Sequence, residues 1–358
     1  MNEISVLSKK LQGETGFHLS RAKFIAQFLM TVIDKRTVNL SELALGMAGK
    51  IKKDSAYRKL QRFFQHFTLP YGLIARMLIN FLPTGPLVLS IDRTNWKYGR
   101  KDINIFMLCA HYRGIGIPII WKMLPKSGNS NTTERTELLC LFIDLFGKGR
   151  IKYLLADREF IGEDWFEFLL KERIPFYIRI RNNTLVNYSN GKTKKAYRFF
   201  TGQQGSAQRD VKLGKDRLNL AGKYLGKGEY LIVATNVTVK NALAIYKERW
   251  QIEMFFSCLK TRGFRLEETH MSDPEKIKKL IALLALAFLW CHKLGEEKDR
   301  EEPIKIKKHG RKANNLFRYG LDYIRKLISP FNCQLSWFRM ALHLFQQNLS
   351  TITLKITT

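Results

Sequence analysis

The spacing of apolar residues changes near residue 83, and this change divides the chain. Before that point, apolar residues recur every three to four positions, the spacing typical of helices. The pattern predicts helices over 20–34, 39–49 and 55–67, with Asn39 as the N-cap of the second. The first 82 residues are therefore expected to be helical.

The third of these helices is basic on one side. Arg58 and Arg62 fall on its polar face, while Leu60, Phe63 and Phe64 fall on the opposite face. Three short helices with a basic third one are typical of helix-turn-helix DNA-binding modules, so we expect residues 1–82 to bind DNA. An ordinary solvated helix face has the same pattern and remains an alternative.

From residue 83 the pattern becomes one of short apolar runs that alternate with amphipathic segments. Continuous apolar runs of this length are typical of buried strands, and the longer amphipathic segments are typical of helices. The predicted order is strand 86–92, strand 103–112, strand 116–124, helix 133–147, strand 151–157, helix 163–172 and strand 176–181. This order predicts an α/β fold with a mixed sheet flanked by helices.

Residues 182–228 interrupt this pattern. They contain ten Lys or Arg, two Asp and seven Gly, with short β-like pieces between them, which predicts a basic, β-rich insertion. A strand at 229–236 and a single long helix over 241–260 resume the core. The core is therefore expected to span 83–270.

The remaining residues, 271–358, are predicted to form a helical C-terminal region. Their longest apolar run, 280–291, is too short to cross a bilayer and predicts a buried helix. The predicted architecture is thus an α/β core with a β-rich insertion and helical regions at both ends.

The charge of the chain indicates the class of its partner. Lys and Arg number 61 and Asp and Glu number 31, so the formal net charge is +30 at pH 7. An excess of this size favours a polyanionic partner, with nucleic acid first. An anionic membrane surface is the alternative, but the sequence contains no lipidation signal that would support it.

Five scattered cysteines form no CxxC pair, which argues against a zinc site or a disulfide framework. The N-terminus lacks the apolar core of a signal peptide. We therefore expect a cytoplasmic protein with reduced thiols.

Two aspartates each end a predicted buried strand. Asp92 ends the strand 86–92, and Asp157 ends the strand 151–157. Ligands of α/β proteins gather at strand ends, so both carboxylates are candidates for one site. For either aspartate alone, capping of the following turn would be the more common role.

The helix predicted over 241–260 carries a polar row beside its apolar stripe. Tyr246, Arg249, Glu253 and Lys260 are spaced by three, four and seven residues, so they project within an arc of roughly 60° on a continuous helix. An ordinary surface pair between Arg249 and Glu253, four residues apart, is the alternative.

Three carboxylates from separate elements suit divalent cations. Oxygen ligands favour Mg²⁺ or Mn²⁺ over zinc. Two such ions, about 3.5–4 Å apart, activate a water or a 3′-hydroxyl and stabilise the leaving oxygen in phosphodiester chemistry. Arg249 and Lys260 would then bind phosphates, with Tyr246 as a hydrogen-bond donor.

These residues resemble the signature of a known family, the DDE transposases of bacterial insertion sequences, specifically the IS-four family. Its Tyr-x2-Arg-x3-Glu-x6-Lys motif is matched by Tyr246, Arg249, Glu253 and Lys260. Its two aspartate segments are similar to SIDRTNWKYG and LADREFIG, which contain Asp92 and Asp157. The resemblance covers about residues 86–270, with a looser match in the helical N-terminal region.

The resemblance implies a ribonuclease-H-like core interrupted by a β insertion. It also implies Mg²⁺, replaceable by Mn²⁺, bound by Asp92, Asp157 and Glu253 as catalytic residues. Family members cleave the ends of their element and join the 3′ ends to target DNA. The expected partners are double-stranded DNA and a second protomer in a synaptic complex, near the bacterial nucleoid. Some members form a DNA hairpin with a flipped base on a tryptophan, but residues 182–228 contain none.

Two other functions remain open at this stage. One is a ribonuclease-H-like, structure-specific nuclease without strand transfer, which differs from a transposase in its products. The other is a non-catalytic DNA-binding protein. The three acids argue against the latter, because a pure binder gains nothing from carboxylates that face phosphates.

Overall fold

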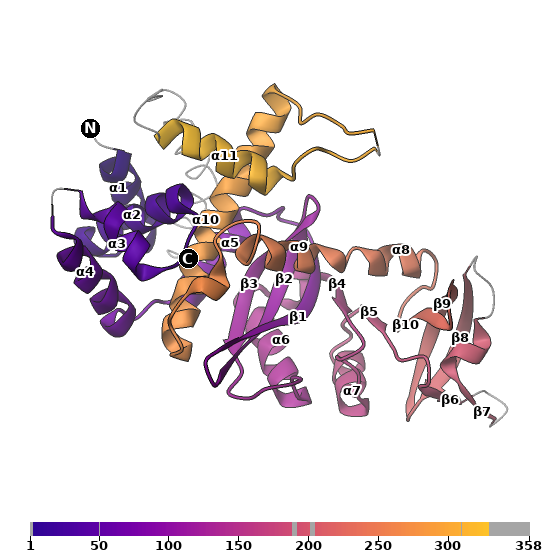
Figure 1. The fold of residues 1–358 in the computed structure, drawn as a ribbon. Helices are drawn as coiled ribbons and strands as arrows, with labels where there is room; N and C mark the ends of the chain where they lie inside the picture. Colours follow the sequence, from indigo (N-terminus) through magenta and orange to yellow (C-terminus); the bar gives the residue numbers. More distant parts are fainter. Residues whose placement is uncertain (1–2, 50, 188–191, 201–204, 309, 329–358) are drawn as a thin grey trace. The chain divides into compact units, whose positions relative to one another are not determined.

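The computed structural model describes residues 3–49, 51–187, 192–200, 205–308 and 310–328 (Figure 1). The chain divides into two compact units. The first contains Met1–Leu82, Trp96–Lys101 and Phe256–Thr358; the second contains Pro83–Asn95 and Asp102–Phe255. The N-terminal helices and the described C-terminal helices thus belong to one unit, whereas the sequence pattern predicts two separate regions.

The first unit is mainly helical in its described part. Its helices are α1 (Glu3–Thr15), α2 (Leu19–Lys35), α3 (Leu40–Ala48), α4 (Lys53–His66), α5 (Tyr71–Asn80), α10 (Pro274–Glu301) and α11 (Leu316–Ile328), with a short 3-10 turn at Leu266–Glu268. The three predicted helices correspond to α2, α3 and α4. Asn39 is the N-cap of α3, as predicted, and its side chain accepts a hydrogen bond from the Ser41 amide.

Helix α10 forms the core of this unit. It packs against α2, α4, α5 and α11, and every residue of the apolar run 280–291 is buried. The Lys279 ammonium on α10 donates a hydrogen bond of 2.7 Å to the carbonyl of Phe64 on α4. The expectation of a buried helix is therefore confirmed. Within the described part of the chain, none of the helices has the length and apolar character needed to cross a membrane.

Two glycines allow α10 and α11 to approach closely. A Cβ atom on Gly320 would lie 1.8 Å from the carbonyl oxygen of Cys291, and one on Gly295 would lie 1.9 Å from that of Leu316. Any larger residue would force the helices apart, so this contact requires glycine at both positions.

The second unit is built on one mixed sheet. Its strands are β1 (Leu87–Tyr98), β2 (Lys101–Tyr112), β3 (Ile115–Met123), β4 (Ile151–Ala156), β5 (Phe176–Arg179), β6 (Leu185–Asn187), β7 (Thr193–Lys195), β8 (Ser206–Leu213), β9 (Asp216–Gly226) and β10 (Glu229–Thr235). Their order is β3-β2-β1-β4-β5-β10-β9-β8-β6-β7. Strands β1, β4 and β5 are parallel, while β2–β3, β5–β10 and β10–β9 are antiparallel. The predicted mixed α/β fold is confirmed.

Helices cover both faces of this sheet (Figure 1). Helix α6 (Thr132–Phe146) connects β3 to β4, and α7 (Glu163–Lys171) connects β4 to β5. Both connections advance across the sheet in the same direction, so right-handed crossovers place α6 and α7 on one face. Helix α8 (Ala242–Lys247) packs on β5, β9 and β10, on the other face.

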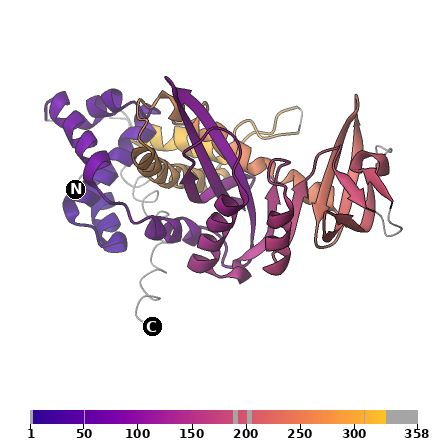
Figure 2. The same ribbon diagram turned by 90° about the horizontal axis from the view of Figure 1, so that it is seen from below.

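The segment predicted as an insertion contains β6 to β9 and a 3-10 turn at Ala196–Phe199. Residues 188–191 and 201–204 within it lie outside the described residues. Strand β9 pairs with β10 from Glu229↔Gly226 to Thr235↔Asn219, so the insertion extends the main sheet (Figure 2). It is β-rich and continuous with the core.

One predicted strand boundary is wrong. The sequence predicts that the first strand ends at Asp92, but β1 continues to Tyr98. The partner strand explains the difference: β4 ends at Ala156, whereas β2 still flanks β1 beyond that point. Asp92 therefore lies inside a long strand, and only Asp157 directly follows the end of one.

Candidate active site

The register of β1 and β4 brings the two aspartates side by side. The last pair between these parallel strands is Ile91↔Ala156. Asp92 and Asp157 are the next residues along the chain, Asp92 still within β1 and Asp157 just after β4. Since neighbouring strands lie about 4.8 Å apart, the two aspartates begin as neighbours at the point where the ladder ends.

Side-chain alternation places both aspartates on the α8 face of the sheet. Leu155 on β4 belongs to an apolar cluster with Ala242 and Tyr246 of α8. Asp157 lies two residues after Leu155 and so shares its face. Ser90 on β1 pairs with Leu155, and Asp92 follows it by two residues. Both carboxylates therefore project toward α8.

The helix predicted over 241–260 is interrupted in its middle. Helix α8 ends at Lys247, and α9 (Trp250–Leu259) begins three residues later. In between, the Arg249 amide bonds the Tyr246 carbonyl at 3.0 Å, and the Ile252 amide bonds the Arg249 carbonyl at 3.1 Å. These i to i+3 bonds are typical of a 3-10 turn. The prediction of one continuous helix is wrong, because Arg249 lies in this turn.

Arg249 connects the predicted site residues. Its Nη1 lies 3.2 Å from Asp92 Oδ2, and its Nη2 forms an ion pair with Glu253 Oε1. Its Nε donates to the Tyr246 hydroxyl at 3.1 Å, and that hydroxyl donates to Asp157 Oδ1 at 3.3 Å. Three acids and two further signature residues are thus joined in one network around a single guanidinium.

Burial sets the electrostatics of this network. It raises the pKa of Asp92 to about 7, although the Arg249 guanidinium acts in the opposite direction. Burial also raises the pKa of Tyr246, so its hydroxyl stays protonated. For Arg249, burial lowers the pKa, but Tyr246, Asp92 and Glu253 outweigh it and raise the pKa overall. Arg249 is therefore a permanent cation among the acids.

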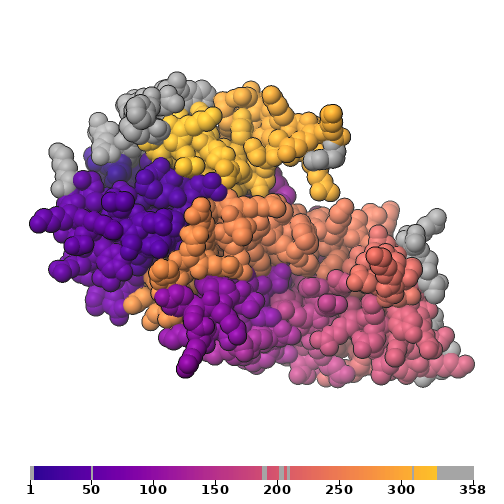
Figure 3. All heavy atoms as spheres, in the orientation of Figure 1, coloured from indigo at the N-terminus to yellow at the C-terminus, as the bar shows by residue number. Residues whose placement is uncertain are grey.

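The site is accessible from solvent. The side chains of Asp92 and Glu253 are 17% and 31% exposed. Trp250, the first residue of α9, is 59% exposed, and the segment containing α8 and the start of α9 is visible on the surface in Figure 3. The Asp92 and Glu253 carboxylates are therefore partly accessible to solvent, while Arg249 and Tyr246 are buried.

The acids fit a divalent cation in the kind of atoms they offer, since carboxylate oxygens are the ligands that Mg²⁺ and Mn²⁺ prefer. The spacing of these carboxylates in the structure, however, does not form a metal site. Within the described ranges, no three His, Cys, Asp or Glu side chains are close enough together to form a metal-binding cluster. Arg249 lies between Asp92 and Glu253, so a cation shared by these carboxylates requires the guanidinium to move.

Lys260, the last residue of the predicted signature, belongs to the first unit. It follows the end of α9, its ammonium lies 2.7 Å from Glu267 Oε1, and it lies 5.9 Å from the centre of the Trp96 ring. Its side chain is 21% exposed. Lys260 is thus held by an acid and an indole of its own unit.

Arg58 and Arg62 are exposed on α4, as the sequence predicts, while Leu60, Phe63 and Phe64 are buried. Arg62 also borders a recess of about 540 Å³ between α3, α4 and the segment before α10. The basic face of α4 is therefore available to a ligand.

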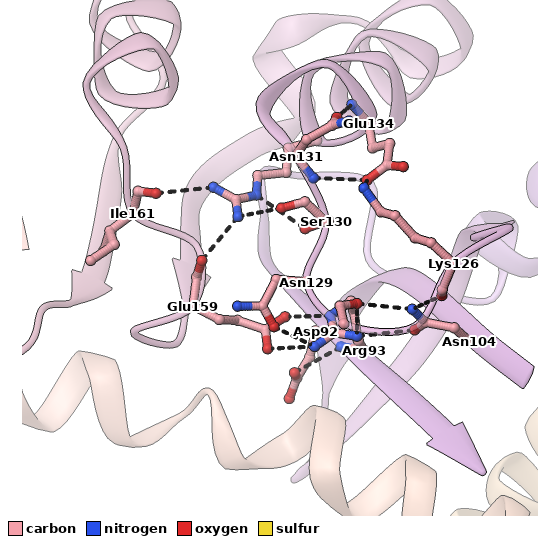
Figure 4. Close-up of polar contacts among 12 residues, drawn as sticks. Asp92, Arg93, Asn104, Lys126, Asn129, Ser130, Asn131, Glu134, Glu159 and Ile161 are labelled. Atoms are coloured by element: carbon pink, nitrogen blue, oxygen red, sulfur yellow. Dashed lines mark hydrogen bonds and ion pairs between the residues drawn. The ribbon is translucent and has the colours of Figure 1, made fainter. Parts of the chain in front are cut away.

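Two charged residues beside the aspartates are absent from the predicted site. Arg93 directly follows Asp92, and Glu159 lies two residues after Asp157. Their side chains form a two-bond ion pair of 2.7 and 2.9 Å (Figure 4). The available signal is their opposite charge within two residues of the two acids.

Comparison with known proteins agrees with this geometry. A family model described as a transposase DDE domain matches residues 83–290, which include all three acids. Among solved structures, the chain is similar to the piggyBac transposase in a cryo-EM structure of its synaptic complex with hairpin DNA. The TM-score is 0.51 at 13% identity, over 98% of this chain and 82% of that chain. No match was found among curated protein sequences.

The structural similarity supports the fold alone, because the identity is low. The family model covers more than half of the chain and contains the whole Arg249 network. The chain therefore belongs to the DDE-domain transposases, enzymes of DNA transposition and recombination that generally use divalent metal ions.

Proposed function

We propose that this protein is the transposase of a bacterial insertion sequence of the IS-four family. It binds the ends of its element, cleaves the phosphodiester bonds there and transfers the 3′ ends to target DNA, in a cut-and-paste reaction. One observation supports this most strongly: within the DDE domain, Asp92 and Glu253 contact one guanidinium, and the Tyr246 hydroxyl links Asp157 to it.

The core is proposed to be ribonuclease-H-like. Strands β3-β2-β1-β4-β5 form consecutive neighbours, with crossover helices after β3 and β4. Asp92 lies on β1, the central strand of this group, and Asp157 follows β4, its parallel neighbour. Glu253 lies on α9, on the face of the sheet opposite to α6 and α7. This arrangement supports an active site at the point where the β1–β4 ladder ends.

Asp92, Asp157 and Glu253 are proposed to hold Mg²⁺, for which Mn²⁺ can substitute. When bound, a pair of such ions activates the attacking water or 3′-hydroxyl and stabilises the leaving oxygen. The chain itself supplies three carboxylates on one face of the sheet. The apolar cluster between α8 and the sheet excludes water from one side of this site.

Arg249 is proposed to exchange partners during the reaction cycle. Without metal and DNA, it neutralises Asp92 and Glu253, which would otherwise repel each other. With a divalent cation held by the carboxylates, they would no longer need the guanidinium to offset their charge. Its planar fork suits the two oxygens of a DNA phosphate, so it is proposed to hold a phosphate near the scissile bond, with Tyr246 as a neighbouring donor.

Double-stranded DNA, as element ends and as target, is the proposed partner. The net charge of +30 supplies sequence-independent affinity. The piggyBac transposase, which shares the fold, was solved in a synaptic complex with hairpin DNA. By analogy, two protomers are proposed to pair the element ends, in the cytoplasm near the nucleoid.

Arg58 and Arg62 are proposed to contact DNA phosphates. Replacing both with alanine is expected to flatten the salt dependence of end binding by about two units, because each phosphate contact contributes about 0.9 to the slope. Both side chains are exposed, so the melting temperature of the variant should equal that of the wild type. The measurement is the binding constant between 50 and 200 mM salt. An unchanged slope would assign these residues to an ordinary solvated helix face.

Lys260→Ala tests the remaining signature residue. If Lys260 exchanges Glu267 for a phosphate when DNA binds, the variant should bind end DNA more weakly and its salt slope should fall by about one unit. Glu267→Gln is the matched control, because it removes the carboxylate partner of the ammonium and should strengthen binding slightly. A lower melting temperature with an unchanged slope would show that Lys260 has only a structural role.

The function as a whole is tested by incubating the protein with the terminal repeats of its own element and Mg²⁺, and sizing labelled products. Cleaved ends joined to target DNA support the transposase. Cleaved ends that are never joined favour a structure-specific nuclease. Protected ends without cleavage in Mg²⁺ or Mn²⁺ favour a non-catalytic DNA-binding protein.

A further inference from the structure

Arg93 and Glu159 connect the two aspartate-bearing segments from the opposite side. Arg93 is the next residue after Asp92 on β1, so its side chain projects from the other face of the sheet. Its Nε lies 2.7 Å from Glu159 Oε1, and its Nη2 lies 2.9 Å from Glu159 Oε2. Neither side chain takes part in the hydrogen bonds of the Arg249 network.

The Arg93 guanidinium has all its hydrogen-bonding capacity in use. An arginine offers five N–H donors. Besides its two bonds to Glu159, it donates to Asn104 Oδ1 at 3.1 Å, to the Gly128 carbonyl, and to Asn129 Oδ1 at 2.8 Å (Figure 4). The side chain is 11% exposed. A guanidinium held at every donor is a fixed point and not a mobile surface charge.

The Glu159 segment is fixed independently by a second arginine. Arg135 of α6 is 5% exposed and donates to the carbonyls of Glu159 at 2.9 Å and Ile161 at 3.2 Å. Its guanidinium also lies 5.3 Å from the centre of the buried Phe160 ring. The backbone after Asp157 is thus anchored, so Arg93 is tied to a rigid partner.

This bridge lies where the strand ladder stops. Beyond Ile91↔Ala156 no ladder pair holds β1 to β4. Besides its bond from the Arg249 network, each aspartate accepts one from the next backbone amide, Arg93 N to Asp92 Oδ1 at 2.8 Å and Arg158 N to Asp157 Oδ1 at 2.7 Å. Those local bonds orient each carboxylate but do not set the distance between the two segments. The Arg93–Glu159 pair is a side-chain link across that gap.

We propose that Arg93 and Glu159 are positioning residues that fix the separation of the Asp92 and Asp157 carboxylates for shared divalent cations. The inference rests on the proposed metal-dependent function of that site. Metal sites tolerate errors of only about 0.5 Å in ligand placement, and loss of an outer support typically lowers metal affinity or activity by about 10–100-fold. The pair acts through the backbone and touches neither metal nor DNA.

The first variant is Arg93→Lys, which keeps the charge but loses the planar fork and two of the five donors. Binding of Mn²⁺ alone to the full chain, measured by electron paramagnetic resonance of the free ion, is expected to weaken at least about tenfold. DNA-end affinity should stay unchanged, and the Mg²⁺ concentration for half-maximal cleavage should rise in parallel.

Arg150→Lys is the matched control. Arg150 directly precedes β4, and its guanidinium donates to the carbonyls of Gly85 and Pro83 just before β1. It therefore ties the same two strands at their other ends. If a looser contact between β1 and β4 were enough to weaken Mn²⁺ binding, both variants should lose Mn²⁺ affinity. If Arg93 positions the carboxylates, Mn²⁺ affinity should fall only in Arg93→Lys.

Glu159→Gln keeps the test valid if Arg93→Lys folds poorly, because the glutamine amide has nearly the shape of the carboxylate and keeps one oxygen that accepts a hydrogen bond from Arg93. A smaller loss of Mn²⁺ affinity is expected. Mn²⁺ affinities and Mg²⁺ requirements equal to those of the wild type in both folded variants would overturn the positioning role alone. A wild-type protein that binds Mn²⁺ no better than its Asp92→Asn variant, and does not cleave, would overturn the proposed function together with this inference.

Discussion

Asp92→Asn is expected to abolish metal-dependent cleavage of the element ends while DNA binding persists. Asp92 lies on the central strand of the core, next to Asp157 and in contact with Arg249. An amide cannot replace a carboxylate as a ligand for a hard divalent cation without a large loss of affinity. We expect the cleavage rate to fall by about 10³-fold or more, equivalent to about 4 kcal/mol of transition-state stabilisation.

The variant should remain folded, which makes the result interpretable. Burial raises the pKa of Asp92 to about 7, so its ionised form is costly to hold in the fold, and a neutral amide of the same shape avoids this cost. Arg249 also keeps its ion pair with Glu253. The expected melting temperature of the metal-free variant is at or above that of the wild type.

The measurements are gel-resolved cleavage, end binding in Ca²⁺ and thermal melting on the same preparation. Asp164→Asn is the control, because Asp164 is exposed in the first turn of α7 and should leave cleavage unchanged. Nicking by Asp92→Asn at the wild-type rate in Mg²⁺ would exclude this residue from the active site.

Local patterns suffice for much of this site. Asp157 directly follows a short apolar run, and the structure places it after β4. The same rule indicates Asp92, but for an incorrect reason, since β1 continues past it. The alternation of buried Thr94 and Trp96 with exposed Asn95 and Lys97 was the signal for that extension. Period-two alternation predicts a strand, but a strand that is apolar at first and alternating later is easily divided in two.

Other features depend on contacts that no local pattern contains. Helical spacing correctly grouped Tyr246, Arg249 and Glu253, yet it cannot show that Arg249 lies in a turn between two helices. Nor can it show that Arg249 pairs with an acid 157 positions earlier. The Arg93–Glu159 pair likewise requires the parallel register of β1 and β4. Long-range registry is a property of the packed sheet and is absent from the sequence neighbourhood of either residue.

The grouping of helices is a similar case. Helix α10 buries its apolar run against helices near the start of the chain, with Lys279 bonded to the Phe64 carbonyl across 215 positions. The sequence of an amphipathic or apolar helix shows that its apolar surface must be buried, but it does not identify the element that packs against that surface. The sequence therefore predicts two separate helical regions where the structure has one compact unit.

Arg249→Met should destabilise the metal-free protein and make its stability depend on Mg²⁺. Methionine keeps much of the length of the side chain but removes the guanidinium that contacts Asp92 and Glu253. Removing one partner of a buried ion pair costs about 3–5 kcal/mol, and the partial exposure of Glu253 favours the lower end, about 3 kcal/mol. Cleavage should also fall, because a phosphate loses its proposed partner.

Divalent cations should reverse the loss of stability in this variant. With Arg249 gone, Mg²⁺ binds the acids without displacing a guanidinium, and ligand at 100 times its Kd stabilises a protein by about 2.7 kcal/mol. Mg²⁺ is therefore expected to raise the melting temperature of Arg249→Met by several degrees more than that of the wild type. The measurement is thermal melting across a Mg²⁺ titration, without DNA.

Two further variants separate this effect from a general one. Arg150→Met removes a guanidinium that bonds only carbonyls, so its loss of stability should not respond to Mg²⁺. Combining Arg249→Met with Asp92→Asn should remove most of the Mg²⁺ response. If Arg249→Met melts at the same temperature with and without Mg²⁺, the guanidinium is a structural partner of the acids and does not occupy the position of a metal ion.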